Sequence, residues 1–146
     1  MSRQEPVLDQ LNLVVEDMEA TLGFYRALGL AIRVAPDGQH ASAELANGVT
    51  LECDAPSFVA QWDSGWRGTT GGGPVIGFSL PDRDAVDRTF AELTGAGHRA
   101  HQQPYDAFWG ARYAIVDDPD GHPVGLMSPI EDSRKFWPPQ RPPHPS

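Results

Sequence analysis

The chain repeats itself at an offset of 65 positions. Asp17 and Asp82 are equivalent, and each precedes a segment in which apolar residues recur at helical spacing. The same offset relates four further pairs: Glu19 and Asp84, Ala20 and Ala85, Tyr25 and Phe90, and Leu28 and Leu93. A repeat of this period indicates two copies of one supersecondary unit that bury their apolar surface together.

Each copy predicts a strand, a helix and three further strands. Leu11 and Leu13 alternate with polar neighbours, which is typical of a half-buried strand, and Asp17 and Gly29 suit the two ends of a helix. The first copy is expected to form strands at 7–15, 31–34, 40–45 and 49–54, and the second at 75–80, 98–103, 111–116 and 123–128. The predicted fold class is therefore α+β, with two βαβββ repeats forming a cupped mixed sheet.

The predicted organisation is one domain over residues 1–130. It contains two modules, at about 6–54 and 74–129, joined by a loop at 55–73 that is rich in aromatic residues and glycine. The tail at 131–146 is rich in proline, which disfavours helices and central strands.

Charge and composition exclude several classes of protein. The chain has 20 acidic and 11 basic residues, and this net charge of -9 argues against a nucleic-acid partner and favours a neutral or cationic small molecule. The sequence contains no run of about 18 apolar residues, so no membrane span is expected. The N-terminus lacks the apolar core of a signal peptide, so export is not expected. The single Cys53 is consistent with a reducing compartment, so a cytoplasmic location is expected.

Two sequence stretches carry a resemblance to a known family. The first is Leu11–Met18 followed by Phe24-Tyr25, and the second is Phe108–Tyr113 followed by Asp117–His122. Over about residues 7–130 the chain resembles the vicinal-oxygen-chelate superfamily, which includes glyoxalase I, extradiol dioxygenases and bleomycin-resistance-type binding proteins.

The resemblance also implies where a metal would be bound. Members with metal chemistry place ligands on the first and last strands of each module, which correspond here to Gln10, Glu52, Val75 and Gly125. Valine and glycine side chains cannot coordinate a metal, and a catalytic site normally needs three firm protein ligands. The expectation is therefore that the protein uses no metal and no other cofactor, as in the bleomycin-resistance-type members.

The predicted ligand site combines polar residues of the strands with aromatic residues of the loops. Alternation along the strands places polar side chains on one face of the sheet, and the loop aromatics suit stacking on a flat ligand. Some of these rings could instead be hydrophobic plugs or dimer contacts, and Phe136 and Trp137 could simply attach the tail. The predicted ligand-binding residues are Gln10, Asn12, His40, Ser42, Glu52, Phe58, Trp62, Trp66, Phe108, Trp109, Arg112, Tyr113 and Met127.

The leading functional hypothesis is an antibiotic-resistance-type protein that sequesters a hydrophobic, planar aromatic compound without turnover. The resemblance implies a homodimer. The alternative is a small lyase, isomerase or oxygenase in which Glu52 is the base and His40 or Tyr113 the acid. In a protein that only binds its ligand, Glu52 would contact the ligand or pair with Arg112.

The other histidines do not have the spacing of a set of metal ligands, and His122 is expected to be exposed.

Overall fold

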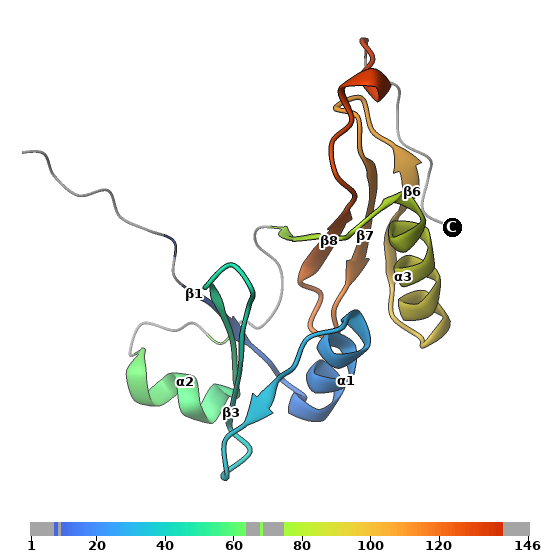
Figure 1. The fold of residues 1–146 in the computed structure, drawn as a ribbon. Helices are drawn as coiled ribbons and strands as arrows, with labels where there is room; N and C mark the ends of the chain where they lie inside the picture. The colour runs from blue at the N-terminus through green and yellow to red at the C-terminus, as the bar shows by residue number, and fades with distance from the viewer. Residues whose placement is uncertain (1–7, 9, 64–67, 69–74, 139–146) are drawn as a thin grey trace, which may run out of the picture. The chain divides into compact units, whose positions relative to one another are not determined.

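The computed structural model describes residues 8, 10–63, 68 and 75–138. The chain divides into two compact units, residues 1–70 and 71–146, and each contains one βαβββ module (Figure 1). The two-module α+β fold predicted from the repeat is confirmed. None of the described helices is long and apolar enough to cross a membrane.

The first unit contains one mixed four-stranded sheet and two helices. Its elements are β1 (Gln10–Val14), α1 (Met18–Leu28), β2 (Arg33–Val34), β3 (His40–Glu44), β4 (Thr50–Asp54) and α2 (Pro56–Trp62). The strand order is β1-β4-β3-β2, with β1 parallel to β4 and the other pairs antiparallel. The parallel pair requires a crossover, which α1 and the β2–β3 hairpin supply.

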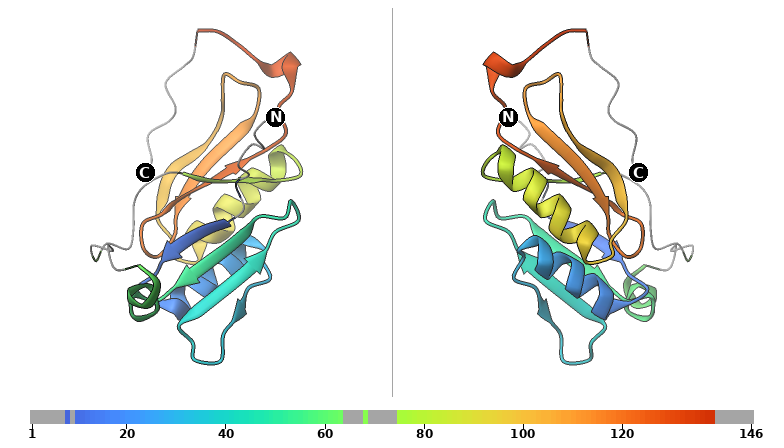
Figure 2. Two further views of the ribbon diagram at one scale, coloured as in Figure 1. Left: turned by 90° about the vertical axis from the view of Figure 1, so that its left-hand side faces the viewer. Right: turned by 90° about the vertical axis from the view of Figure 1, so that its right-hand side faces the viewer.

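The second unit has the same topology. Its elements are β5 (Ile76–Ser79), α3 (Arg83–Gly95), β6 (Ala100–Asp106), β7 (Arg112–Asp117), β8 (Pro123–Met127) and a 3-10 turn at Asp132–Arg134. The strand order is β5-β8-β7-β6, again with the first and last strands of the module parallel. In each unit the long helix lies along one face of the sheet (Figure 2).

The residues that define the repeat begin the two long helices. The Asp17 side chain accepts a hydrogen bond from the backbone N–H of Ala20, and Asp82 accepts one from Ala85, at 3.1 and 2.8 Å. Each carboxylate satisfies an N–H group that the first helical turn leaves without a partner. Gly29 ends α1 with a φ of 116°, as the predicted stop requires.

Strand alternation separates a core face from a polar face in the first unit. Leu51 and Cys53 on β4 are buried, as are Phe24 and Tyr25 on α1. The intervening position on β4, Glu52, therefore projects from the opposite face of the sheet. The face that α1 leaves uncovered is the one that carries the polar residues predicted to bind a ligand.

The segment 55–73 was predicted as a loop, but it begins with helix α2. Pro56 occupies the first turn, where its missing N–H costs nothing, and Val59 is fully buried. The helix brings Phe58 and Trp62 into a defined position. After α2, the segment lies outside the described residues except for Asp63 and Gly68, and so do residues 139–146 of the predicted tail.

The segment after β8 is fastened to the β6–β7 connection by its backbone. Glu131 N–H donates to the carbonyl of Gly110, and Phe136 N–H donates to the carbonyl of Phe108, at 3.0 and 3.1 Å. Gly110 has a φ of 94°, and a Cβ atom there would overlap the carbonyl oxygen of Glu131. Glycine is therefore required at this position both for its backbone conformation and for the close approach.

We predict that Gly110→Ala destabilises the protein more than Gly121→Ala does. Both glycines have positive φ, at 94° and 86°, but a Cβ at Gly121 meets nothing within 4 Å. The control should cost about 1–2 kcal/mol for the left-handed backbone alone, and Gly110→Ala about 1–3 kcal/mol more for the overlap. Urea unfolding measures both free energies, and equal values would contradict the assigned role of Gly110.

Candidate functional site

A cavity of about 380 Å³ lies in the first unit. Strands β1, β3 and β4 form its floor, and α2 contributes aromatic side chains. The described residues that line it are Gln10, Asn12, His40, Glu52, Asp54, Phe58 and Trp62. Six of these seven were predicted from the sequence as ligand-binding residues, and Asp54 is the addition.

The strand register brings the polar residues together. Asn12 on β1 lies beside Glu52 on β4, and His40 on β3 lies opposite Asp54 on β4. Because adjacent strands place register partners on the same face, four side chains from three strands converge. Ser42 lies opposite Glu52 in the register but is not among the lining residues.

Asn12 connects the two carboxylates of the floor. Its amide Nδ2 donates to Glu52 Oε2 at 2.8 Å and to Asp54 Oδ2 at 3.3 Å. Its Oδ1 accepts a hydrogen bond of 3.0 Å from Gln10 Nε2. Through these bonds Asn12 keeps the two acidic groups in one arrangement, and both amide groups are directed toward protein acceptors.

His40 is oriented by a buried carboxylate. Asp54 is only 1% exposed, and its Oδ1 is hydrogen-bonded to His40 Nδ1. A carboxylate accepts hydrogen bonds, so the proton of this bond belongs to Nδ1. The ring also stacks on Phe58, with centroids 5.1 Å apart and planes at 32°. These two contacts fix the direction of Nε2, which lies 3.9 Å from Glu52 Oε1.

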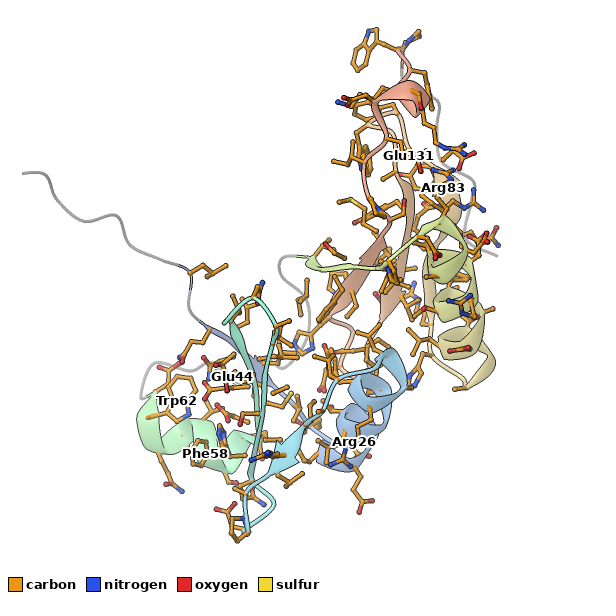
Figure 3. The ribbon with its side chains drawn as sticks, in the orientation of Figure 1. Arg26, Glu44, Phe58, Trp62, Arg83 and Glu131 are labelled. Carbon is orange, nitrogen blue, oxygen red and sulfur yellow. The ribbon has the colours of Figure 1, made fainter. Side chains whose placement is uncertain are left out.

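Phe58 and Trp62 form the apolar part of the cavity. Both extend from α2, one helical turn apart (Figure 3). Phe58 packs on His40, whereas Trp62 is 50% exposed and has a ring surface that a ligand can cover. Trp66, which was predicted to join them, lies outside the described residues.

The residues at the family's metal-ligand positions do not fit a metal. In the second unit, Val75 offers no donor atom, and a Cβ at Gly125 would lie 2.9 Å from the Tyr113 hydroxyl and 3.2 Å from Val75 Cγ1. A ligating side chain at Gly125 would therefore displace the Tyr113 ring. In the first unit, Glu52 is hydrogen-bonded to Asn12, and Gln10 is a weak ligand.

The remaining predicted aromatic residues gather in the second unit. Trp109 contacts Phe108 and Tyr113 edge to face, with centroids 5.2 and 5.4 Å apart, and its indole N–H donates to Met127 Sδ at 3.4 Å. Burial raises the pKa of the Tyr113 phenol above its ordinary value. A second cavity of about 480 Å³ is lined by Phe108, Trp109, Lys135, Phe136 and Trp137.

Arg112 is committed to acidic partners of the second unit. Its Nε donates to Asp87 Oδ1 at 2.9 Å, and its Nη1 donates to Asp106 Oδ1 at 3.2 Å. Partial burial opposes the charge of the guanidinium, but hydrogen bonds and attraction from Asp87 and Asp106 raise its pKa overall. The structure therefore shows Arg112 paired with two aspartates of its own unit.

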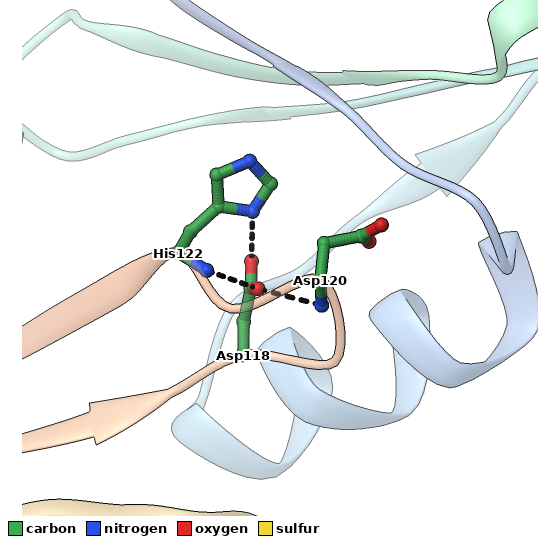
Figure 4. Close-up of side chains that lie close together, drawn as sticks. All are labelled: Asp118, Asp120 and His122. Carbon is green, nitrogen blue, oxygen red and sulfur yellow. Dashed lines mark hydrogen bonds and ion pairs between the residues drawn. The ribbon is translucent and has the colours of Figure 1, made fainter. Parts of the chain in front are cut away.

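Three side chains at the β7–β8 turn also lie close together (Figure 4). The candidate ligand atoms of Asp118, Asp120 and His122 are within 4.8 Å of one another. However, Asp118 Oδ1 accepts the backbone N–H groups of both other residues, and Oδ2 bonds His122 Nδ1 at 2.7 Å. These bonds close the turn, and His122 is 6% exposed, so the prediction that it is exposed was wrong.

We predict that Zn²⁺, Ni²⁺ or Fe²⁺ leaves the melting temperature of the chelator-treated, untagged protein unchanged. A metal that binds the folded state raises its stability by mass action, and the family's ligand positions here hold valine and glycine. Differential scanning calorimetry with and without each ion measures the effect. A saturable increase that a chelator reverses would contradict the metal-free assignment.

We also predict that neutral His40 carries its proton on Nδ1. Long-range proton–nitrogen NMR reports the tautomer, and Asp54→Asn should shift it toward Nε2–H because an amide nitrogen can donate to Nδ1. His101, whose Nδ1 lies 2.7 Å from Asp117 Oδ1, provides an internal control that this substitution leaves unchanged. An Nε2–H tautomer of His40 in the unmodified protein would refute the proposed orientation.

Comparison with known proteins finds sequence relatives that match most of the chain. An uncharacterised protein of Mycobacterium bovis is 32% identical over 136 residues, covering 88% of this chain and 86% of the relative. An uncharacterised protein of Mycobacterium tuberculosis H37Rv is also 32% identical over 136 residues, and the match covers 88% of this chain and 77% of the relative. These names describe no activity that could be transferred.

Solved structures agree on the fold. A glyoxalase-related enzyme from Fulvimarina pelagi superposes with a TM-score of 0.74 at 22% identity, covering 84% of this chain and 88% of that one. The hypothetical protein SA1046 from S. aureus gives 0.72 at 21% identity, covering 87% and 96%. The sequence model of one superfamily matches residues 7–126. The chain therefore belongs to the Glyoxalase/Bleomycin resistance protein/Dioxygenase superfamily.

Proposed function

We propose that the protein is a bleomycin-resistance-type binding protein that sequesters a hydrophobic, planar aromatic compound without turnover. The observation that carries the proposal is the cavity of the first unit, in which Phe58 and Trp62 lie over a hydrogen-bonding floor. Small-molecule sites commonly combine such apolar walls with a few oriented polar groups.

The aromatic wall supplies part of the affinity that a micromolar binder needs. Covering about 200 Å² of apolar ligand and protein surface contributes about 5 kcal/mol at ~25 cal/mol/Å². Stacking on Trp62 adds about 0.5–1.5 kcal/mol beyond that area. Hydrogen bonds to the floor supplement these contributions, and a micromolar dissociation constant corresponds to about 8 kcal/mol.

The floor favours binding over catalysis. An anionic intermediate needs donors aimed at the reacting oxygen, but the amides of Gln10 and Asn12 donate to protein oxygens. The described lining contains neither lysine nor arginine. A base without an electrophilic partner is an incomplete catalytic set.

One observation favours a second candidate, a small enzyme that works by proton transfer. His40 is oriented by the buried Asp54, as a general base would be, and its Nε2 lies near Glu52. Such an enzyme would be a lyase or isomerase of the same superfamily. It would convert its ligand, whereas a sequestering protein would return the ligand unchanged.

The proposal includes a homodimer in the cytoplasm, with a small molecule and no nucleic acid as partner. The excess of 20 acidic over 11 basic residues supports the exclusion of nucleic acid. The superfamily's binding proteins support the dimer by analogy.

We predict that planar aromatic antibiotics quench the intrinsic fluorescence, and that Trp62→Ala weakens their binding at least about tenfold by removing the stacking surface. Trp137→Ala is the matched control, because Trp137 is 77% exposed and is not among the described residues that line this cavity. Calorimetry measures both affinities, and mass spectrometry should recover the ligand unchanged.

The proposed function fails if no member of a broad panel binds and expression protects no sensitive host. Time-dependent product formation would instead establish the enzymatic candidate. An equal loss of affinity in the Trp62 and Trp137 variants would place the ligand outside the cavity of the first unit.

A further inference from the structure

We infer that the ligand of this cavity carries a primary ammonium group that donates one hydrogen bond to His40 Nε2 and a second to Glu52 Oε1. The inference rests on the proposed binding function and identifies the chemical class of its ligand: a planar aromatic amine that is a cation at neutral pH. It follows from the direction of two acceptors, the charge of the lining and the position of the aromatic rings.

The first acceptor is His40 Nε2. The Nδ1 proton is committed to Asp54, a residue only 1% exposed, so the neutral ring presents Nε2 as a hydrogen-bond acceptor. The tilted contact with Phe58 supports this orientation of the ring. This nitrogen therefore has a fixed direction before any ligand arrives, which reduces the entropy lost on binding.

The second acceptor is Glu52 Oε1. The other oxygen of this carboxylate, Oε2, accepts a hydrogen bond of 2.8 Å from Asn12, which holds the group in place. Oε1 lies 3.9 Å from His40 Nε2, which is too long for a hydrogen bond between them. Two acceptors at this separation can be bridged by one atom that bears two hydrogens, as an amine nitrogen does.

The charge of the cavity favours a cation over a neutral donor. Its described lining contains the carboxylates Glu52 and Asp54 and neither lysine nor arginine. The faces of Phe58 and Trp62 carry negative charge, and a cation within about 6 Å of such a ring gains about 0.5–2 kcal/mol. An ammonium on an aromatic ligand satisfies the acceptors and the rings together.

A metal ion is a poorer occupant of the same acceptors. His40 and Glu52 provide two firm ligands, and Gln10 is a weak third. Asp54 is already bound to the other nitrogen of His40. The aromatic wall would remain unused by a hydrated metal, whereas it covers the ring system of an organic amine.

Three naphthalene compounds test the inference on the intact protein. They carry the same ring and differ only in the substituent at position 2: aminomethyl, trimethylammoniomethyl or hydroxymethyl. The first has charge and several N–H groups, the second has charge without N–H, and the third has one O–H without charge. We expect calorimetry to give the aminomethyl compound a dissociation constant at least about tenfold below those of the other two.

A pair of variants locates the contact. Glu52→Gln keeps the shape of the side chain but removes its charge. It should therefore lower the affinity for the aminomethyl compound at least about tenfold, and the affinity for the hydroxymethyl compound by less than about threefold. Glu44→Gln on β3 changes net charge equally and is the control, because Glu44 lies on the same strand as His40 but is not among the described residues that line the cavity. It should leave all three affinities unchanged.

The outcomes separate this inference from the proposed function. Equal affinities for the three compounds, or an aminomethyl affinity that Glu52→Gln does not change, would overturn the ammonium assignment and leave the binding function standing. Failure of all three compounds to bind would also overturn the ammonium assignment, whereas the proposed function is decided by the broad panel and the protection assay. Tight binding of the trimethylammonio compound alone would show a cation site without hydrogen-bond recognition and would equally refute the inference.

Discussion

The arrangement of the site depends on one buried carboxylate, that of Asp54. A carboxylate removed from water is costly unless hydrogen bonds compensate for its lost hydration, and Asp54 obtains them from His40 and Asn12. Because Asn12 also donates to Glu52, the same set of bonds positions both acidic groups and the imidazole. The cavity is therefore organised before a ligand enters, with its recognition groups already oriented by the protein.

Sequence patterns were sufficient for the fold and for most of the described residues that line the cavity of the first unit. The offset between Asp17 and Asp82 predicted both modules, because each carboxylate caps a helix. Strand alternation placed Gln10, His40 and Glu52 on one face, where the structure brings them together. Asp54 lies two positions after Glu52 and follows from the same alternation, although it was not included. Helix α2 was missed because the aromatic residues and glycines of segment 55–73 indicated a loop. The burial of His122 depends on hydrogen bonds within a folded turn, which no local pattern reports.

The two units have the same topology but different side-chain chemistry on corresponding strands. In the second unit Tyr113 occupies the space beside Gly125, at the position where the family resemblance implied a metal ligand. In the first unit, Gln10 and Glu52 have been incorporated into a hydrogen-bond network with Asn12. The scaffold is thus retained while its ligand positions perform other tasks, and this is why membership in the superfamily does not by itself determine function.

The most direct measurement of the central claim is a crystal structure of the protein with 2-(aminomethyl)naphthalene. The account predicts the amine nitrogen within hydrogen-bond distance of both His40 Nε2 and Glu52 Oε1, with the naphthalene ring against Trp62. A transition-metal ion coordinated by Gln10 and Glu52, or a ligand located away from α2, would contradict it.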